Sequence, residues 1–253
     1  MSGVLTRRKL MTTGLMAAAG ASGLAAAARL ADRYGLIPPD SGGIYGVGET
    51  LTYAAQRLLM SQHSQAREFN RSDISSVAPV NGGPPETEAY ARLLSGQFAE
   101  WRLVVDGLVA RPSSFSLAEL QRFPSRSQIT HQACEEGWSF IAEWTGVPLS
   151  HVMNLVGVSP RAKYVVFIPF DQSWDSLDMP DAWHPQTLLA YRMNGEELPT
   201  GHGAPVRLRV ARQLGYKSVK YLSRITVVDT VKDISKGLGS WSPEIGYSWY
   251  AGI

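Results

Sequence analysis

The sequence predicts an α+β fold in which mixed sheets are combined with short helices. Between residues 101 and 229, short apolar segments with the composition of strands follow one another closely. Candidate helices lie among them in irregular order, with long loops between, which argues against a regular winding of alternating strands and helices. Neither a GxGxxG nor a GxxxxGK[ST] loop is present, so a nucleotide site has no sequence support.

Five segments have the features of strands, being rich in β-branched residues and bounded by glycine, proline or polar residues. In chain order they are 102–105, 128–131, 163–168, 206–210 and 221–228. In the fourth segment Arg207 and Arg209 alternate with apolar residues, so a strand would turn both arginines to one face. A solvated sheet edge would show the same alternation.

The remaining periodic segments are candidate helices. Residues 50–61 have helical spacing, and Ser116 with Glu119 forms a capping box that starts a short helix ending before Pro124. Segments 148–156 and 185–193 each begin with a proline, which the first turn of a helix tolerates.

The chain of 253 residues divides into three parts. Residues 1–28 resemble a twin-arginine export leader, since Arg7 and Arg8 precede an uncharged run of small residues. An uncleaved membrane anchor is the alternative. Residues 29–100, rich in glycine, proline and polar residues, are expected to form an arm and a helix that wrap the core, and residues 101–253 the catalytic domain.

The leader and the charge balance set expectations for compartment and partners. A twin-arginine leader implies that the protein is exported folded to the periplasm, a route whose cargo often carries a cofactor. The formal charge of +2 falls close to zero once the basic leader residues are removed, which disfavours a nucleic-acid partner.

The single cysteine, Cys134, follows a predicted strand in a polar loop with Glu135, Glu136 and, three residues before it, His131. Three interpretations compete: a buried structural thiol, a nucleophile activated by His131, and a thiolate ligand to a metal. The adjacent carboxylates raise the pKa of the thiol and disfavour the nucleophile, whereas a metal cation removes that penalty. No second cysteine is available to complete a zinc site, so other ligands to a metal would come from outside the chain.

A basic segment follows later in the chain. His202 lies between glycines, Arg207 comes five residues later, and Lys217 and Lys220 form a second basic cluster. Arginine forks, lysine charges and glycine-freed amides are the groups that hold a phosphate-bearing anion. The segment therefore predicts a site for a large anionic ligand.

Together these segments resemble the molybdopterin-binding domain of the sulfite oxidase family. The likeness is greatest to its bacterial branch, which includes the catalytic subunit of periplasmic methionine sulfoxide reductase. It covers about residues 101–229 and rests on pieces that occur in the family's order: 101–109 with Pro112, the loop 134–139 with 144–149, 190–195, 203–208 and 215–220. The resemblance implies a sulfite-oxidase-type fold and one molybdenum held by a single pterin dithiolene.

The resemblance also implies roles for individual residues. Cys134 matches the one protein ligand of molybdenum, whose other equatorial ligands are the dithiolene and an oxo group. The matched cofactor contacts are His202 and Asn70, Arg207 at the cofactor phosphate, and the loop Ser218, Val219 and Lys220. Ile168 and Pro169 stand where relatives have a threonine, so no contact is carried over there.

The resemblance implies a two-electron oxygen-atom transfer by an oxidoreductase. Sulfite-oxidising relatives place arginines shortly after the cysteine, whereas Glu135 and Glu136 stand here and would repel a dianion. A sulfoxide or N-oxide is therefore the expected substrate, with Glu135, Glu136 and Trp138 as its candidate contacts. The carboxylates could instead bond backbone amides or the pterin.

The alternatives are sulfite oxidation, a non-catalytic anion-binding module on the same fold, and a cysteine hydrolase. The chain has no Cys-x-x-Cys-His haem motif, so a separate electron-transfer partner is expected, and by family analogy this is a membrane haem protein. The length leaves little room for a dimerisation domain, which predicts a monomer.

Overall fold

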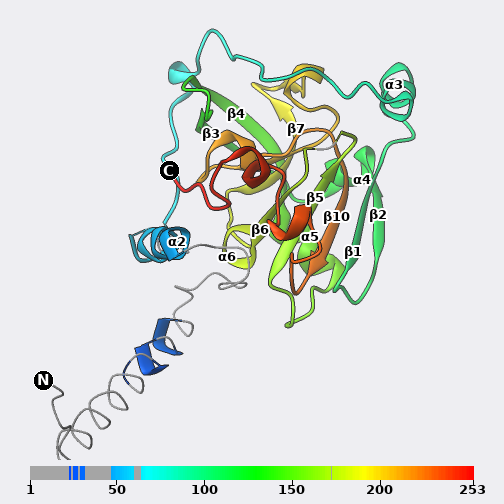
Figure 1. Ribbon diagram of the computed structural model, residues 1–253. Helices are drawn as coiled ribbons and strands as arrows, with labels where there is room; N and C mark the ends of the chain where they lie inside the picture. Colours follow the sequence, from blue (N-terminus) through cyan, green and yellow to red (C-terminus); the bar gives the residue numbers. More distant parts are fainter. Residues whose placement is uncertain (1–22, 24, 28, 32–46, 60–63, 172) are drawn as a thin grey trace, which may run out of the picture.

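The computed structural model describes residues 23, 25–27, 29–31, 47–59, 64–171 and 173–253 (Figure 1). Most of the predicted leader therefore lies outside the described residues; positions 23 and 25–27 are helical. Among the residues that the structure describes, no helix has the length and apolar character needed to cross a membrane.

Two five-stranded sheets form the body of the protein. The first has the order β2 (Ser113–Ser116), β1 (Arg102–Gly107), β10 (Leu222–Val228), β5 (Tyr164–Pro169) and β6 (Asp175–Asp178). The second has the order β3 (Arg126–Ala133), β4 (Ser139–Pro148), β7 (Thr187–Met193) and β8 (Glu196–Glu197), with β9 (Arg207–Val210) paired to β7. Only β1 and β10 are parallel among these pairs, so the first sheet is mixed, as predicted, whereas the described pairs of the second sheet are all antiparallel.

Two helices precede the first strand, α2 (Val47–Leu59) and α3 (Glu88–Ser95), and three short helices lie between strands, α4 (Leu117–Arg122), α5 (Leu149–Val156) and α6 (Met179–Ala182). Single 3₁₀ turns lie at η1 (Arg71–Asp73), η2 (Thr200–His202), η3 (Gly215–Lys217), η4 (Ser235–Gly237) and η5 (Ser242–Ile245). The predicted capping box starts α4, where Ser116 Oγ accepts from the Glu119 N–H at 3.2 Å.

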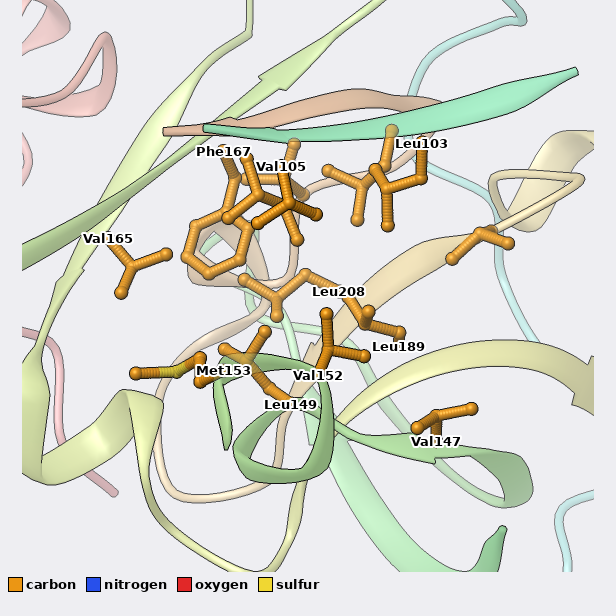
Figure 2. Close-up of a cluster of buried hydrophobic side chains, with 14 of the residues drawn as sticks. Leu103, Val105, Val147, Leu149, Val152, Met153, Val165, Phe167, Leu189 and Leu208 are labelled. Carbon is orange, nitrogen blue, oxygen red and sulfur yellow. The ribbon is translucent and has the colours of Figure 1, made fainter. Parts of the chain in front are cut away.

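The main core lies between the two sheets, where apolar side chains from both meet α5 (Figure 2). Leu103 and Phe167 come from the first sheet, Leu189 and Leu208 from the second, and Met153 from the helix. Full burial of each such side chain stabilises the fold by about 1.5–3 kcal/mol.

One predicted helix, 185–193, is wrong: residues Thr187–Met193 form β7, which lies between β4 and β9 in the second sheet. Every residue of β7 except Arg192 is buried. A central strand that is buried on both faces reads as a continuous apolar run, so periodicity does not separate it from a buried helix.

The segment before β1 crosses the second sheet. The Phe69 N–H donates to the Ile129 carbonyl at 2.9 Å and the Ser75 N–H to the Ile141 carbonyl at 3.0 Å. Tyr90 of α3 is buried and donates its hydroxyl to the Ala204 carbonyl at 2.8 Å. Residues 64–100 thus run along β3 and β4 before they reach the first sheet (Figure 1).

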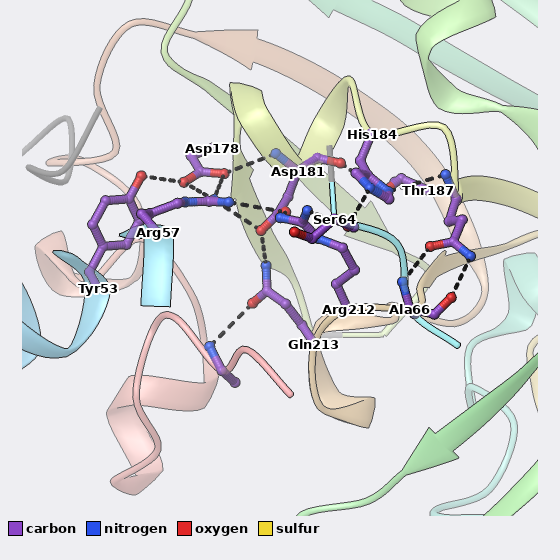
Figure 3. Close-up of polar contacts among 12 residues, drawn as sticks. Tyr53, Arg57, Ser64, Ala66, Asp178, Asp181, His184, Thr187, Arg212 and Gln213 are labelled. Atoms are coloured by element: carbon purple, nitrogen blue, oxygen red, sulfur yellow. Dashed lines mark hydrogen bonds and ion pairs between the residues drawn. The ribbon is translucent and has the colours of Figure 1, made fainter. Parts of the chain in front are cut away.

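A buried polar cluster joins α2 to the body (Figure 3). Arg57 Nη2 donates to Asp178 Oδ1 at 2.7 Å and to Asp181 Oδ2 at 3.1 Å. Arg212 Nη2 donates to Asp181 Oδ1 at 2.8 Å. The Arg57 guanidinium also lies over the ring of Tyr250, which brings the end of the chain to the same cluster.

Candidate active site

Cys134 lies at the tip of the hairpin formed by β3 and β4. Its N–H donates to the Trp138 carbonyl at 2.9 Å, and the Gly137 N–H donates back to the Cys134 carbonyl at 3.1 Å, which closes a tight turn. Gly137 has φ +90°, a conformation that glycine adopts without steric cost. The turn holds the thiol, which is 8% exposed, at the wall of a pocket.

Burial, together with the Glu135 carboxylate, raises the pKa of the Cys134 thiol. Its Sγ donates to Glu135 Oε2 at 3.3 Å, and the Asn81 side-chain amide donates to Sγ at 3.7 Å. The raised pKa disfavours a free thiolate nucleophile, and a bound metal cation would remove this penalty. His131 does not line the pocket, which disfavours the nucleophile interpretation.

The pocket is a cavity of about 300 Å³. It is formed by the arm, the cysteine loop, the residues after β5, the segment around η2, the loop after β9, and the C-terminal segment. The predicted site residues that line it are Cys134, Glu135, Trp138, His202, Arg207, Ser218, Val219 and Lys220. The structure therefore brings together two sequence motifs about seventy residues apart.

Arg207 is 5% exposed, and the ion pairs of the described residues do not include it. Its Nη1 donates to the His202 carbonyl at 2.9 Å and its Nη2 to the Ser218 carbonyl at 2.8 Å. Burial lowers the pKa of Arg207 to about 10. Arg209 is fully buried as well, so the solvated sheet edge considered from the sequence is wrong.

The other basic groups of the pocket are also held by carbonyl oxygens. Lys220 Nζ donates to the Asn81 carbonyl at 2.5 Å and to the Gly201 carbonyl at 3.0 Å. Burial and the Arg207 charge lower the pKa of Lys220 to about 8. Burial and the same arginine lower the pKa of His202 to about 4. The pocket therefore carries positive charge that an anionic ligand would stabilise.

These residues fit a pterin cofactor with a phosphate group. A buried guanidinium needs an anion, and Arg207 lies where one could reach it from the pocket. Gln132, also buried in the pocket wall, has a side-chain oxygen without a hydrogen-bond partner in the described structure, and this acceptor suits a ligand with N–H donors. The described residues contain no group of three His, Cys, Asp or Glu that could hold a metal ion.

Asn70 is not brought to this pocket. It is exposed, it precedes η1, and its N–H donates to Asp73 Oδ2 at 2.9 Å. Asn81 lies beside the thiol instead. Glu136 is exposed outside the pocket lining, where it accepts a hydrogen bond from Trp138 Nε1 at 2.8 Å.

Sequence reasoning missed several residues that line the pocket: Asn81, Gln132, Asp171, Gly215, Tyr216 and Trp241. Asn81 begins an Asn-Gly-Gly run that reads as a turn, and only its proximity to Cys134 in the structure identifies it. Gly215 allows close packing, since a Cβ there would lie 2.7 Å from Gln132 Nε2.

Comparisons with known proteins agree with this site. Residues 92–235, more than half of the chain, match the family described as oxidoreductase molybdopterin binding domain. The chain is 40% identical over 154 residues to a putative protein-methionine-sulfoxide reductase subunit YedZ1 of Azospira oryzae, covering 61% of this chain and 56% of that protein. It is 32% identical over 167 residues to the protein-methionine-sulfoxide reductase catalytic subunit MsrP of Xanthomonas campestris, covering 60% and 52%.

Among solved structures, the sulfane dehydrogenase SoxCD of Paracoccus pantotrophus matches with a TM-score of 0.51 and 27% identity, covering 55% of this chain and 41% of that chain. The chain spans about half the length of the curated relatives it matches. The family match includes Cys134, Arg207 and Lys220. The chain therefore belongs to the oxidoreductase molybdopterin-binding domain family, and is an oxidoreductase domain whose cofactor is molybdenum-molybdopterin.

Proposed function

We propose that this protein reduces a sulfoxide, or a related N-oxide, by removing its oxygen atom. In the overall reaction the substrate takes up two electrons and two protons and yields one water together with a thioether from a sulfoxide, or an amine from an N-oxide. The observation that supports this most is the pocket itself, which unites Cys134 with Arg207 and Lys220 and places the Glu135 carboxylate beside the thiol.

Some residues of the pocket would hold the cofactor, and others would contact the substrate. When bound, the cofactor supplies a two-electron centre for oxygen-atom transfer. Cys134 would be its protein ligand, and Arg207 with Lys220 would hold its phosphate. Ser218 keeps this arrangement in place, because its carbonyl accepts from Arg207 and its hydroxyl accepts from the Val210 N–H at 3.0 Å.

The substrate preference follows from the charges that remain once the cofactor is bound. Glu135 and Asp171 line the pocket, and the ion pairs of the described residues include neither of them. The phosphate would take up the positive charge of Arg207 and Lys220, leaving an acidic entrance. Such an entrance repels sulfite and accepts a neutral sulfoxide.

The partners and the compartment are part of the proposal. Relatives are named as a subunit and as a catalytic subunit of protein-methionine-sulfoxide reductases, which supports a separate electron donor. We infer that this donor is a membrane haem protein, that the twin-arginine leader carries the folded protein to the periplasm, and that the catalytic chain is monomeric.

The first experiment expresses the chain with its leader in a host that makes molybdopterin. Elemental mass spectrometry should find close to one molybdenum per chain. With a reduced viologen as electron donor, the protein should reduce sulfoxides. With ferricyanide as electron acceptor, it should not oxidise sulfite. Turnover of sulfite alone would replace the proposal by sulfite oxidation. Folded, exported protein without molybdenum would leave the anion-binding module, and rapid alkylation of Cys134 without metal would favour the hydrolase.

A further inference from the structure

The C-terminal segment, residues 238–253, lies beyond the family match at 92–235 but forms part of the pocket wall. Trp241 and Ser242 line the pocket together with the cysteine loop and the loop after β9. A segment that the family match does not include therefore contributes to the wall of the candidate pocket.

The backbone at Trp241 is held firmly. Its N–H donates to the Trp174 carbonyl at 3.2 Å, and Ser242 Oγ donates to Asp175 Oδ2 at 3.4 Å. Asp175 in turn forms a buried ion pair with Lys217, which precedes the predicted cofactor loop. The Lys217 ammonium also lies 4.7 Å from the ring centroid of Trp249. The position of Trp241 is thus tied to the loop that would hold the cofactor.

The side chain of Trp241 is nevertheless 41% exposed. Trp138, which also lines the pocket, is fixed by its bond to Glu136 and stacks on Phe140 with ring centroids 6.1 Å apart. A large apolar ring that lines the pocket and remains half in water can gain contact area when an organic ligand rests on it. Thioether and sulfoxide sulfur atoms also contact aromatic rings favourably.

We propose that Trp241 is a specificity-determining residue that supports the organic body of the substrate and so favours a sulfoxide on an extended side chain over a small one. The inference rests on the proposed function, because it concerns the same pocket. On this proposal the C-terminal segment determines the preference between extended and small sulfoxides, whereas Cys134 and the cofactor contacts have the same role for both.

The test compares the holoenzyme with Trp241→Ala, Trp241→Phe and the matched control Trp183→Ala. Trp183 is 38% exposed, close to the exposure of Trp241, but does not line the pocket. The measured quantity is the ratio of kcat/KM for N-acetylmethionine sulfoxide methyl ester to kcat/KM for dimethyl sulfoxide, at matched molybdenum content. We expect this ratio to fall about tenfold in Trp241→Ala, to fall less in Trp241→Phe, and to stay at the wild-type value in Trp183→Ala.

A second measurement needs no turnover. Calorimetric titration of the same holoenzymes with the thioether N-acetylmethionine methyl ester should show about tenfold weaker binding to Trp241→Ala than to the control. Unchanged affinity and an unchanged kcat/KM ratio would overturn the role of Trp241, as would an equal loss for both sulfoxides. If the wild type reduces neither sulfoxide, the proposed function fails, and the thioether titration alone decides for or against Trp241.

Discussion

The side-chain amide of Asn81 lies 3.7 Å from the Sγ of Cys134, although 53 residues separate them in the chain. Asn81 belongs to the arm that precedes the first strand, and its carbonyl also accepts from Lys220 Nζ. One residue of the arm therefore touches both the candidate metal ligand and the candidate phosphate contact. The arm is part of the site and not only a covering of the core.

Asn81→Ala should lower kcat/KM about ten- to hundredfold, because it removes a group that orients the candidate metal ligand. Asn70→Ala is the matched control, since Asn70 is exposed at η1 and lies outside the pocket lining. Steady-state kinetics and molybdenum content are measured for both variants. Equal effects of the two substitutions would contradict the placement of Asn81 in the site.

Arg207→Lys should reduce the molybdenum bound per chain by about tenfold or more. A lysine keeps the positive charge but loses the planar guanidinium, which donates to the carbonyls of Leu208, His202 and Ser218 at the pocket wall. Elemental mass spectrometry of purified protein gives the readout. Arg224→Lys, in an exposed ion pair with Asp106, is the control and should retain the metal.

The sequence predicted the parts of this fold that local chemistry determines. The capping box at Ser116 and the strand that precedes Cys134 depend on neighbouring residues, and the structure contains them. The cysteine loop and the basic segment were recognised because their residue types suit one kind of ligand. Their meeting in one pocket was implied by the family resemblance and not by the local pattern.

What could not be predicted depends on tertiary contacts. The segment 187–193 is a strand because it pairs with β4 and β9, and the sequence of the segment itself does not indicate these pairings. Asn81 and Trp241 both line the pocket, but one lies about fifty residues before the cysteine loop in the sequence and the other about a hundred residues after it. No local motif therefore contains them. The burial of Arg57 likewise depends on carboxylates more than a hundred residues away.

Asp178→Asn should lower the free energy of unfolding by about 3–5 kcal/mol, because it removes one partner of a buried ion pair and leaves the Arg57 charge poorly compensated. The asparagine can still cap α6, so lost charge dominates the effect. Arg71→Ala, which breaks a pair whose arginine side chain is 70% exposed, should cost about 0–1 kcal/mol. Urea unfolding of the two variants and the wild type measures both values.

The stability of the protein should also depend on the protonation of His184. Burial and the nearby Arg212 guanidinium lower the pKa of this histidine to about 4. Its Nδ1 accepts the Gln186 N–H at 3.2 Å, and its Nε2 donates to the Ser64 carbonyl at 3.1 Å (Figure 3). A proton on Nδ1 would break the first of these bonds, so the folded state keeps the ring neutral.

The unfolded chain binds this proton at a pKa of about 6.5, above the folded value, so stability should fall as the pH is lowered from about 6.5 to about 4. The difference between the two pKa values corresponds to about 3 kcal/mol, and solvent screening reduces the loss that we expect from His184 to about 2 kcal/mol. His184→Gln removes the titrating group. As the pH is lowered from about 6.5 to about 4, the wild type should therefore lose about 2 kcal/mol more unfolding free energy than the variant. Because other groups titrate equally in both proteins, parallel pH profiles would show that His184 takes up its proton over the same pH range in the folded and unfolded states, which would contradict the lowered pKa.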